Sequence, residues 1–255
     1  MVLSNAAIMH IDTHGFSGKI FFLWIACYRS TMKKPRLVLF ASGTKEGGGS
    51  GFENLVKSPE LDADIFAVVS NHADGGVQMR AEKLGVPFIH FPGPYTAQGY
   101  HDILQKAVAT TGRIWVAFSG WLKKAEGLDP ASTFNIHPAL LSFQDRRFGG
   151  PGLYGHRVHE AVKAALDAGE ITESGFTMHF TTEEYDRGPI FFEHRVPLVK
   201  GMSADEIAKK VNAAEHEWQP RITNMVIHSS IYWNGKDAES LHVPKGYLFL
   251  PKSSS

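Results

Sequence analysis

The chain has 255 residues, of which 43% are hydrophobic and 20% charged, an ordinary globular composition that is long enough for one large domain. Lys plus Arg and Asp plus Glu balance at 26 each, which excludes a global attraction to nucleic acid or to an anionic membrane. The single cysteine, Cys27, excludes an internal disulfide and a cysteine-rich zinc site, and it fits a cytoplasmic location. We expect no nucleic-acid partner and no membrane partner.

The first 34 residues differ in character from the rest. The apolar run at residues 20–28 ("IFFLWIACY") is too short to span a bilayer, which takes about 20 apolar residues. Asp12 precedes it and no small-residue cleavage site follows, which disfavours a signal peptide. Met32 begins "MKKPRLVLF", which looks like a natural start. We therefore predict that residues 1–34 are an N-terminal extension, with residues 1–31 either an upstream extension or an over-predicted start that is not native.

From Arg36 onward, short apolar runs alternate with helical patterns. Strands are predicted at residues 37–41, 65–70, 87–91, 114–118 and 133–136. Helices are predicted from near Phe52, at 77–84 and at 96–110. Continuous apolar strands that alternate with helices are typical of a parallel sheet covered on both faces. This half of the chain therefore predicts an α/β fold, a Rossmann-like, mostly parallel sheet with helices on both faces.

The pattern changes after Pro151. An amphipathic helix is predicted at residues 156–167, and two alternating strands at 175–182 and 190–197 favour an antiparallel pair. Ser203 and Glu206 fit a capping box at the start of a long helix. We predict one domain at residues 35–235, with a C-terminal antiparallel strand extension, followed by a tail at residues 236–255.

A glycine-rich loop, "SGTKEGGGSGF" at residues 42–52, lies between the first strand and the first helix. Free backbone N–H groups and the helix dipole make such a helix N-terminus favourable for a phosphate. The loop does not end in the Gly-Lys-Ser/Thr of a P-loop, and a glycine-rich connection without a ligand is the alternative.

Asn135 and His137 end the fifth predicted strand. Side chains two residues apart in a strand point to the same side, and open α/β sheets bind ligands at the carboxyl ends of their strands. An imidazole can act as a general acid or base, and an amide N–H can stabilise an oxyanion. The alternative is a strand end with two satisfied polar groups, since most of the 13 histidines must be structural.

Two acidic residues are further candidates. Asp186, in "EEYDRGP", is in a sequence typical of a turn, but near His137 its carboxylate could orient the imidazole and favour its charged form. Glu215, followed by His216 late in a helix, would usually belong to a solvated face. Neither H-E-x-x-H nor G-x-S-x-G occurs, which disfavours a zinc peptidase and an α/β-hydrolase.

The segments "FNIHPALL", "GFTMHFTTEEYDRGPIFFEHRVPL" and "NAAEHEWQP", together with "SGW" and "GSGF", occur in this order. In them the chain resembles the phosphoribosylglycinamide formyltransferases, folate-dependent enzymes of purine biosynthesis. The resemblance runs from about Arg36 to about Gly235. It implies transfer of a formyl group from 10-formyltetrahydrofolate to the primary amine of glycinamide ribonucleotide, with no metal, in a monomer or a homodimer with small-molecule substrates.

The resemblance also implies a role for each matching residue. The catalytic residues would be Asn135, His137 and Asp186. The phosphate and ribonucleotide would be bound by Gly49, Ser50, Gly51 and Glu215. The folate would be bound by Leu122, Lys123, Lys124, Thr182 and Asp186.

The chain departs from the family pattern at Ala139, at Ser142 with the loop that follows it, at Gly51, and near Ala97. All of these positions fall on the side that would hold the phosphorylated amine. The alternatives are therefore a formyltransferase for another amine, such as an amino sugar, and a catalytically silent binding module.

Overall fold

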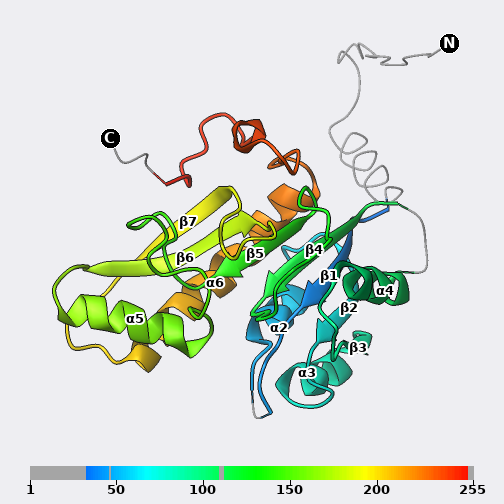
Figure 1. Ribbon diagram of the computed structural model, residues 1–255, viewed down its shortest axis with the longest axis horizontal. Helices are drawn as coiled ribbons and strands as arrows, with labels where there is room; N and C mark the ends of the chain where they lie inside the picture. The colour runs from blue at the N-terminus through cyan, green and yellow to red at the C-terminus, as the bar shows by residue number, and fades with distance from the viewer. Residues whose placement is uncertain (1–32, 46, 109–111, 252–255) are drawn as a thin grey trace, which may run out of the picture. The chain divides into compact units, whose positions relative to one another are not determined.

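The structure is a computed structural model that describes residues 33–45, 47–108 and 112–251 (Figure 1). The predicted extension falls almost wholly outside these residues, including its apolar run and Cys27. The compact unit that contains the fold begins at Pro35. Within the described ranges, no helix combines the length and the apolar character needed to cross a bilayer.

Seven strands of the described chain form one sheet in the order β3-β2-β1-β4-β5-β6-β7 (Figure 1). The strands are β1 (Arg36–Phe40), β2 (Asp64–Ser70), β3 (Phe88–His90), β4 (Ile114–Ser119), β5 (Thr133–His137), β6 (Glu173–Phe180) and β7 (Ile190–Pro197). The first five run parallel, β6 is antiparallel to β5, and β7 is antiparallel to β6. This confirms the predicted mostly parallel sheet with an antiparallel extension, although β6 begins and ends two residues earlier than expected.

The helices follow the sequence signals closely. They are α2 (Ser50–Lys57), α3 (Gly76–Leu84), α4 (Ala97–Ala107), α5 (His156–Asp167), α6 (Ala204–Ile227) and the 3₁₀ turn η1 (Ala238–Ser240). The predicted capping box at Ser203 and Glu206 is present. The expected helix at 96–110 was too long, because Thr96 is the N-cap of α4 and Val108 is already extended.

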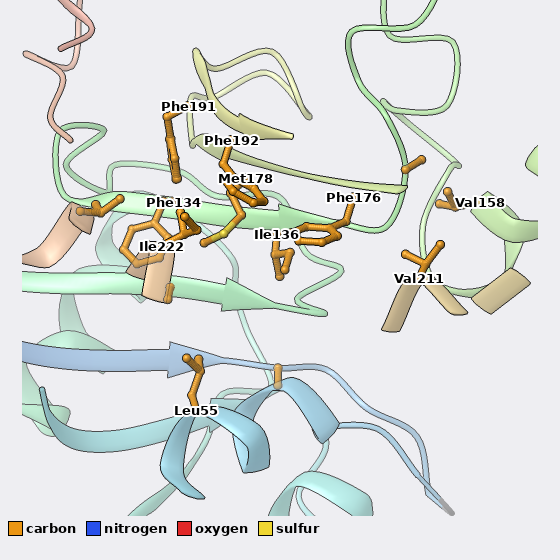
Figure 2. Close-up of a cluster of buried hydrophobic side chains, with 14 of the residues drawn as sticks. Leu55, Phe134, Ile136, Val158, Phe176, Met178, Phe191, Phe192, Val211 and Ile222 are labelled. Carbon is orange, nitrogen blue, oxygen red and sulfur yellow. The ribbon is translucent and has the colours of Figure 1, made fainter. Parts of the chain in front are cut away.

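The alternation of side chains along the central strands explains why helices cover both faces of the sheet. Leu37 and Leu39 of β1 face a core that α2, α5 and α6 complete. Val38 and Phe40 face the opposite core, where α4 supplies Tyr100. Figure 2 shows part of the first core, with the aromatic side chains of β5, β6 and β7 packed together. A strand buried on both faces reads as continuously apolar, which is the pattern seen in the sequence.

The C-terminal tail packs on the edge strand β7. The Glu193 backbone N–H donates to the Phe249 carbonyl at 2.9 Å. The Phe249 ring lies 5.0 Å from the Phe192 ring and 5.1 Å from the Trp218 ring, between ring centres. The tail therefore covers apolar surface that β7 and α6 would otherwise expose.

We expect Phe249→Ala to lower the free energy of unfolding by about 1–3 kcal/mol, because a partly buried aromatic ring loses its packing. Leu248→Ala is the matched control, since Leu248 is 86% exposed, and it should change stability by less than about 0.5 kcal/mol. Urea denaturation measures both. Equal effects of the two substitutions would show that the Phe249 packing contributes nothing.

Candidate active site

A cavity of about 740 Å³ lies at the carboxyl ends of β4 and β5. Its walls come from the glycine-rich loop, from both strand ends, from the segment before α5 and from α6. This is the edge of an open α/β sheet at which ligands bind. Its volume is within the range of small-molecule sites, about 300–1,000 Å³.

Asn135 and His137 both line this cavity, as the alternation along β5 predicts. The His137 side chain is only 5% exposed. Its Nε2 lies 2.7 Å from the Phe148 carbonyl oxygen. Because a carbonyl only accepts, Nε2 carries the hydrogen of the neutral ring, and Nδ1 is the atom that gains or loses a proton.

Asp186 reaches the same place from the loop after β6. Its Oδ1 lies 3.7 Å from His137 Nδ1, and its Oδ2 accepts the Gly150 N–H at 2.8 Å. Asp186 has a φ of 54°, a left-handed conformation that is uncommon outside glycine. The fold thus brings together a carboxylate and an imidazole that sequence spacing alone could not place.

His179 completes the cluster, and the sequence did not single it out. It pairs with Asn135 across β5 and β6. Its Nδ1 donates to the Phe180 carbonyl at 2.8 Å, so its Nε2 is free to accept from Asn135 Nδ2, 3.2 Å away. The same Nε2 lies 3.5 Å from Asp186 Oδ1. The one available signal was a histidine inside an otherwise apolar strand.

Burial sets the protonation of this cluster. It lowers the pKa of His137 below its ordinary value, although the neighbouring Asp186 charge works in the opposite direction. Burial alone raises the pKa of Asp186, but the neighbouring His179 and His137 and the Gly150 N–H outweigh it and hold that pKa well below its usual range. At neutral pH the site therefore holds a neutral imidazole beside a carboxylate.

The glycine-rich loop forms the opposite end of the cavity, where Gly49, Ser50 and Gly51 line it. Gly49 is the N-cap of α2, with a φ of 78° and no side-chain cap, so the first N–H groups of the helix lack partners within it. A Cβ on Gly51 would lie 2.2 Å from Ser119 Oγ, so only glycine allows this close approach to β4. Such a helix start favours an anion.

Helix α6 supplies a third wall with Lys209, Asn212 and Glu215. Burial raises the pKa of Glu215 to about 7, although a hydrogen bond from Asn212 Nδ2, 3.1 Å away, lowers it. The solvated-face interpretation is therefore wrong for Glu215. A carboxyl group with this pKa can donate or accept a hydrogen bond near neutral pH.

The residues expected to bind folate are divided between two cavities. Leu122 lines the large cavity. A neighbouring cavity of about 50 Å³ is lined by, among others, Lys123, Lys124, Thr182 and Asp186. Trp121 and Tyr185 border both cavities. These two aromatic side chains therefore lie where the cavities adjoin.

His159, on α5, is another buried group that the sequence did not single out. It lines the large cavity, and burial lowers its pKa to about 4. Its Nδ1 has no hydrogen-bond partner among the described residues. Across the described ranges, no group of three or more His, Cys, Asp or Glu residues is arranged to hold a metal ion.

A mostly parallel sheet with an Asn–His–Asp group and a glycine-rich loop at the carboxyl ends of its strands is the arrangement of an α/β enzyme. Residues 35–223 match the model of the formyl transferase family, and the chain belongs to that family.

The chain is similar to two plant proteins named phosphoribosylglycinamide formyltransferase, chloroplastic. The Arabidopsis thaliana protein is 31% identical over 215 residues, which cover 79% of this chain and 68% of the relative. The Vigna unguiculata protein is 32% identical over 220 residues, which cover 80% of this chain and 64% of the relative. The chain thus spans about two thirds of the length of these relatives.

A solved structure, that of phosphoribosylglycinamide formyltransferase from Brucella melitensis, has 30% sequence identity and a TM-score of 0.59. The match covers 76% of this chain and 96% of that chain. These comparisons confirm the family resemblance and the fold that the sequence motifs predicted.

Proposed function

We propose that this protein transfers the formyl group of 10-formyltetrahydrofolate to the primary amine of glycinamide ribonucleotide, a step of purine biosynthesis. One observation carries the proposal. A single cavity joins the Asn135, His137 and Asp186 cluster to the glycine-rich start of α2 and to Glu215. This arrangement suits an acceptor with a reactive amine at one end and a phosphate at the other. The names of the plant relatives support the same reaction.

The reaction forms a C–N bond between the acceptor amine and the formyl carbon and breaks the bond from that carbon to folate N10. The amine loses one proton and N10 gains one. Neutral His137 accepts the amine proton at Nδ1 and passes it to N10. Asp186, 3.7 Å from that nitrogen, stabilises the imidazolium while it exists. The lowered pKa of His137 suits a base that must be neutral at rest.

Asn135 stabilises the negative charge on the formyl oxygen. Its amide carries two hydrogens, and one lies toward His179 Nε2 at 3.2 Å. The second amide hydrogen is left to bond the oxyanion. The hydrogen bond to His179 holds the amide so that this hydrogen points into the cavity. Loss of one such donor typically costs a factor of about 10²–10³ in rate.

On the acceptor side, Gly49, Ser50 and Gly51 hold the phosphate at the N-terminus of α2, and Glu215 bonds a ribose hydroxyl. Lys209 adds a positive charge to the same cavity.

On the donor side, Leu122, Lys123, Lys124 and Thr182 with Asp186 contact the folate. The neighbouring cavity, about 50 Å³, is far smaller than the roughly 300 Å³ of a typical ligand site. The folate ring system therefore needs the adjoining space of the large cavity, which Leu122, Trp121 and Tyr185 also line.

The test is a formyl-transfer assay with purified protein, 10-formyltetrahydrofolate and a panel of amines, including glycinamide ribonucleotide and amino-sugar phosphates. Mass spectrometry of the product identifies the acceptor. We expect glycinamide ribonucleotide to be formylated most efficiently. Preference for another amine would overturn the acceptor assignment, and a wild-type rate no higher than that of His137→Ala would overturn the enzyme assignment.

The remaining predictions from the sequence stand as proposals: a domain at residues 35–235, a monomer or homodimer in the cytoplasm, and a reaction without metal. Light scattering in solution tests the oligomeric state. Full activity after dialysis against a chelator would agree with a metal-free reaction, and activity restored only by added metal would contradict it.

A further inference from the structure

The loop at residues 143–150, called the clamp loop below, contacts both members of the proposed catalytic pair. The Phe148 carbonyl accepts from His137 Nε2 at 2.7 Å, and the Gly150 N–H donates to Asp186 Oδ2 at 2.8 Å. Arg146 makes the third contact: its Nη1 donates to the Asp186 carbonyl and its Nη2 to the Gly188 carbonyl, the latter at 3.0 Å. One loop thus holds a ring nitrogen, a carboxylate oxygen and the backbone of the reacting cluster.

The backbone of the clamp loop is unusual. Three consecutive residues, Gln144, Asp145 and Arg146, have φ values of 41°, 49° and 64°. Each non-glycine residue in the left-handed region costs about 1–2 kcal/mol, so a run of three persists only when the surrounding contacts hold it. Such conformations are concentrated at functional sites, and here the run ends at the residue that bonds the Asp186 carbonyl.

Arg146 suits the task of fixing a loop. Its guanidinium is planar and rigid, and its two terminal nitrogens bond two carbonyls two residues apart, on either side of Arg187. Burial lowers the pKa of Arg146, yet a guanidinium stays charged at any working pH. Nearby, a Cβ on Gly149 would lie 3.3 Å from the Asp186 Cβ, so the clamp loop packs directly against the carboxylate residue.

We propose that Arg146 is a positioning residue that fixes Asp186, and through it the carboxylate opposite His137, in the geometry needed for proton transfer. This inference rests on the proposed function, because it assigns Asp186 a part in the reaction. Arg146 acts through the Asp186 backbone: the carbonyl it bonds belongs to a residue whose own φ of 54° has to be maintained. Misplacing a reacting group by about 1 Å can cost about 10² in rate.

The test compares three variants in the formyl-transfer assay. Arg146→Met, which removes both bonds, should lower kcat about 10- to 100-fold while the KM of each substrate changes less than about threefold. Arg146→Lys keeps the charge but can bond only one carbonyl well. Its kcat should lie between that of Arg146→Met and that of the wild type. Arg187→Met is the matched control, because exposed Arg187 pairs with Asp145 across the same two loops. The kcat of Arg187→Met should stay within about twofold of the wild-type value.

A double mutant separates positioning from a general structural role. If Arg146 acts through Asp186, adding Arg146→Met to Asp186→Asn should lower kcat no further. An undiminished loss in the double mutant, a KM effect alone, or an equal loss in Arg187→Met would overturn the proposal. Where Arg146→Met fails to fold, Arg146→Lys carries the same comparison.

Hydrogen exchange at the Gly150 amide tests the clamp without any substrate. Since this N–H donates to Asp186 Oδ2, its exchange should be about tenfold faster in Arg146→Met and unchanged in Arg187→Met. Unchanged exchange in Arg146→Met would overturn the clamp. Faster exchange in a protein that formylates no amine would overturn the proposed function while supporting the clamp.

Discussion

His137→Ala should lower kcat for formyl transfer by a factor of about 10²–10⁴, with little change in the KM of either substrate. The substitution removes the group that we propose accepts and returns the proton, and general acid–base catalysis by a positioned side chain contributes about this much. The control is His101→Ala, because His101 is exposed on α4, away from the cavity. Steady-state kinetics on the two variants, with melting temperatures to confirm folding, measure the difference.

The same assignment predicts the pH dependence of kcat/KM. The base must be neutral, and burial lowers the pKa of His137, so activity should fall only as the pH drops below about 6.5, the ordinary value for histidine. In Asp186→Asn this acid limb should shift to still lower pH, because the carboxylate that raises the pKa of His137 is gone. An acid limb above pH 7, or a His137→Ala enzyme as fast as His101→Ala, would contradict the role of His137.

Glu215→Gln should make the protein more stable at alkaline pH. Burial raises the pKa of Glu215 from 4.5 to about 7 in the folded chain. A carboxyl group with a raised pKa contributes stability that is fully present below pH 4.5 and is lost as the pH rises through about 7, because the folded state holds its proton more tightly. Glutamine removes this loss. The free energy of unfolding of Glu215→Gln should exceed that of the wild type by about 3 kcal/mol at pH 8 and by about 1 kcal/mol or less at pH 5.

Urea denaturation at the two pH values measures the gain, and Glu217→Gln is the control on an exposed neighbour. The same variant should raise the KM for the amine substrate about tenfold, because a hydrogen bond to a charged group is lost. Stability gained together with binding lost is typical of a site residue. A pH-independent change in stability would contradict the raised pKa of Glu215.

The fold was predictable because its signals are local. The apolar strands, the helical periods and the capping box at Ser203 each lie within a few residues of chain. The boundaries of the elements were less accurate, because local signals do not show where strand pairing stops. Thr181 and Thr182 extend the β-branched pattern, yet β6 ends at Phe180. Asn135 and His137 were identifiable as candidates because they are polar and follow an apolar run at a strand end.

The rest of the site depends on contacts between distant segments. Asp186 resembles an ordinary turn residue until the fold places it opposite His137. Glu215 falls on the cavity side of α6 rather than the solvent side, which the helical period alone did not decide. Arg146 gives no sequence signal, because the positioning role that we propose for it depends on a left-handed backbone run and on two carbonyls about 40 positions away.

The tail at β7 also limits how two copies of this protein could associate. An edge strand offers unpaired backbone groups on which a second chain can continue the sheet. In β7 the backbone N–H of Glu193 is already paired, because it donates to the Phe249 carbonyl of the same chain. A homodimer that keeps the tail in place therefore cannot continue the sheet across β7 at this position. Removing the tail would expose a strand edge prone to aggregation.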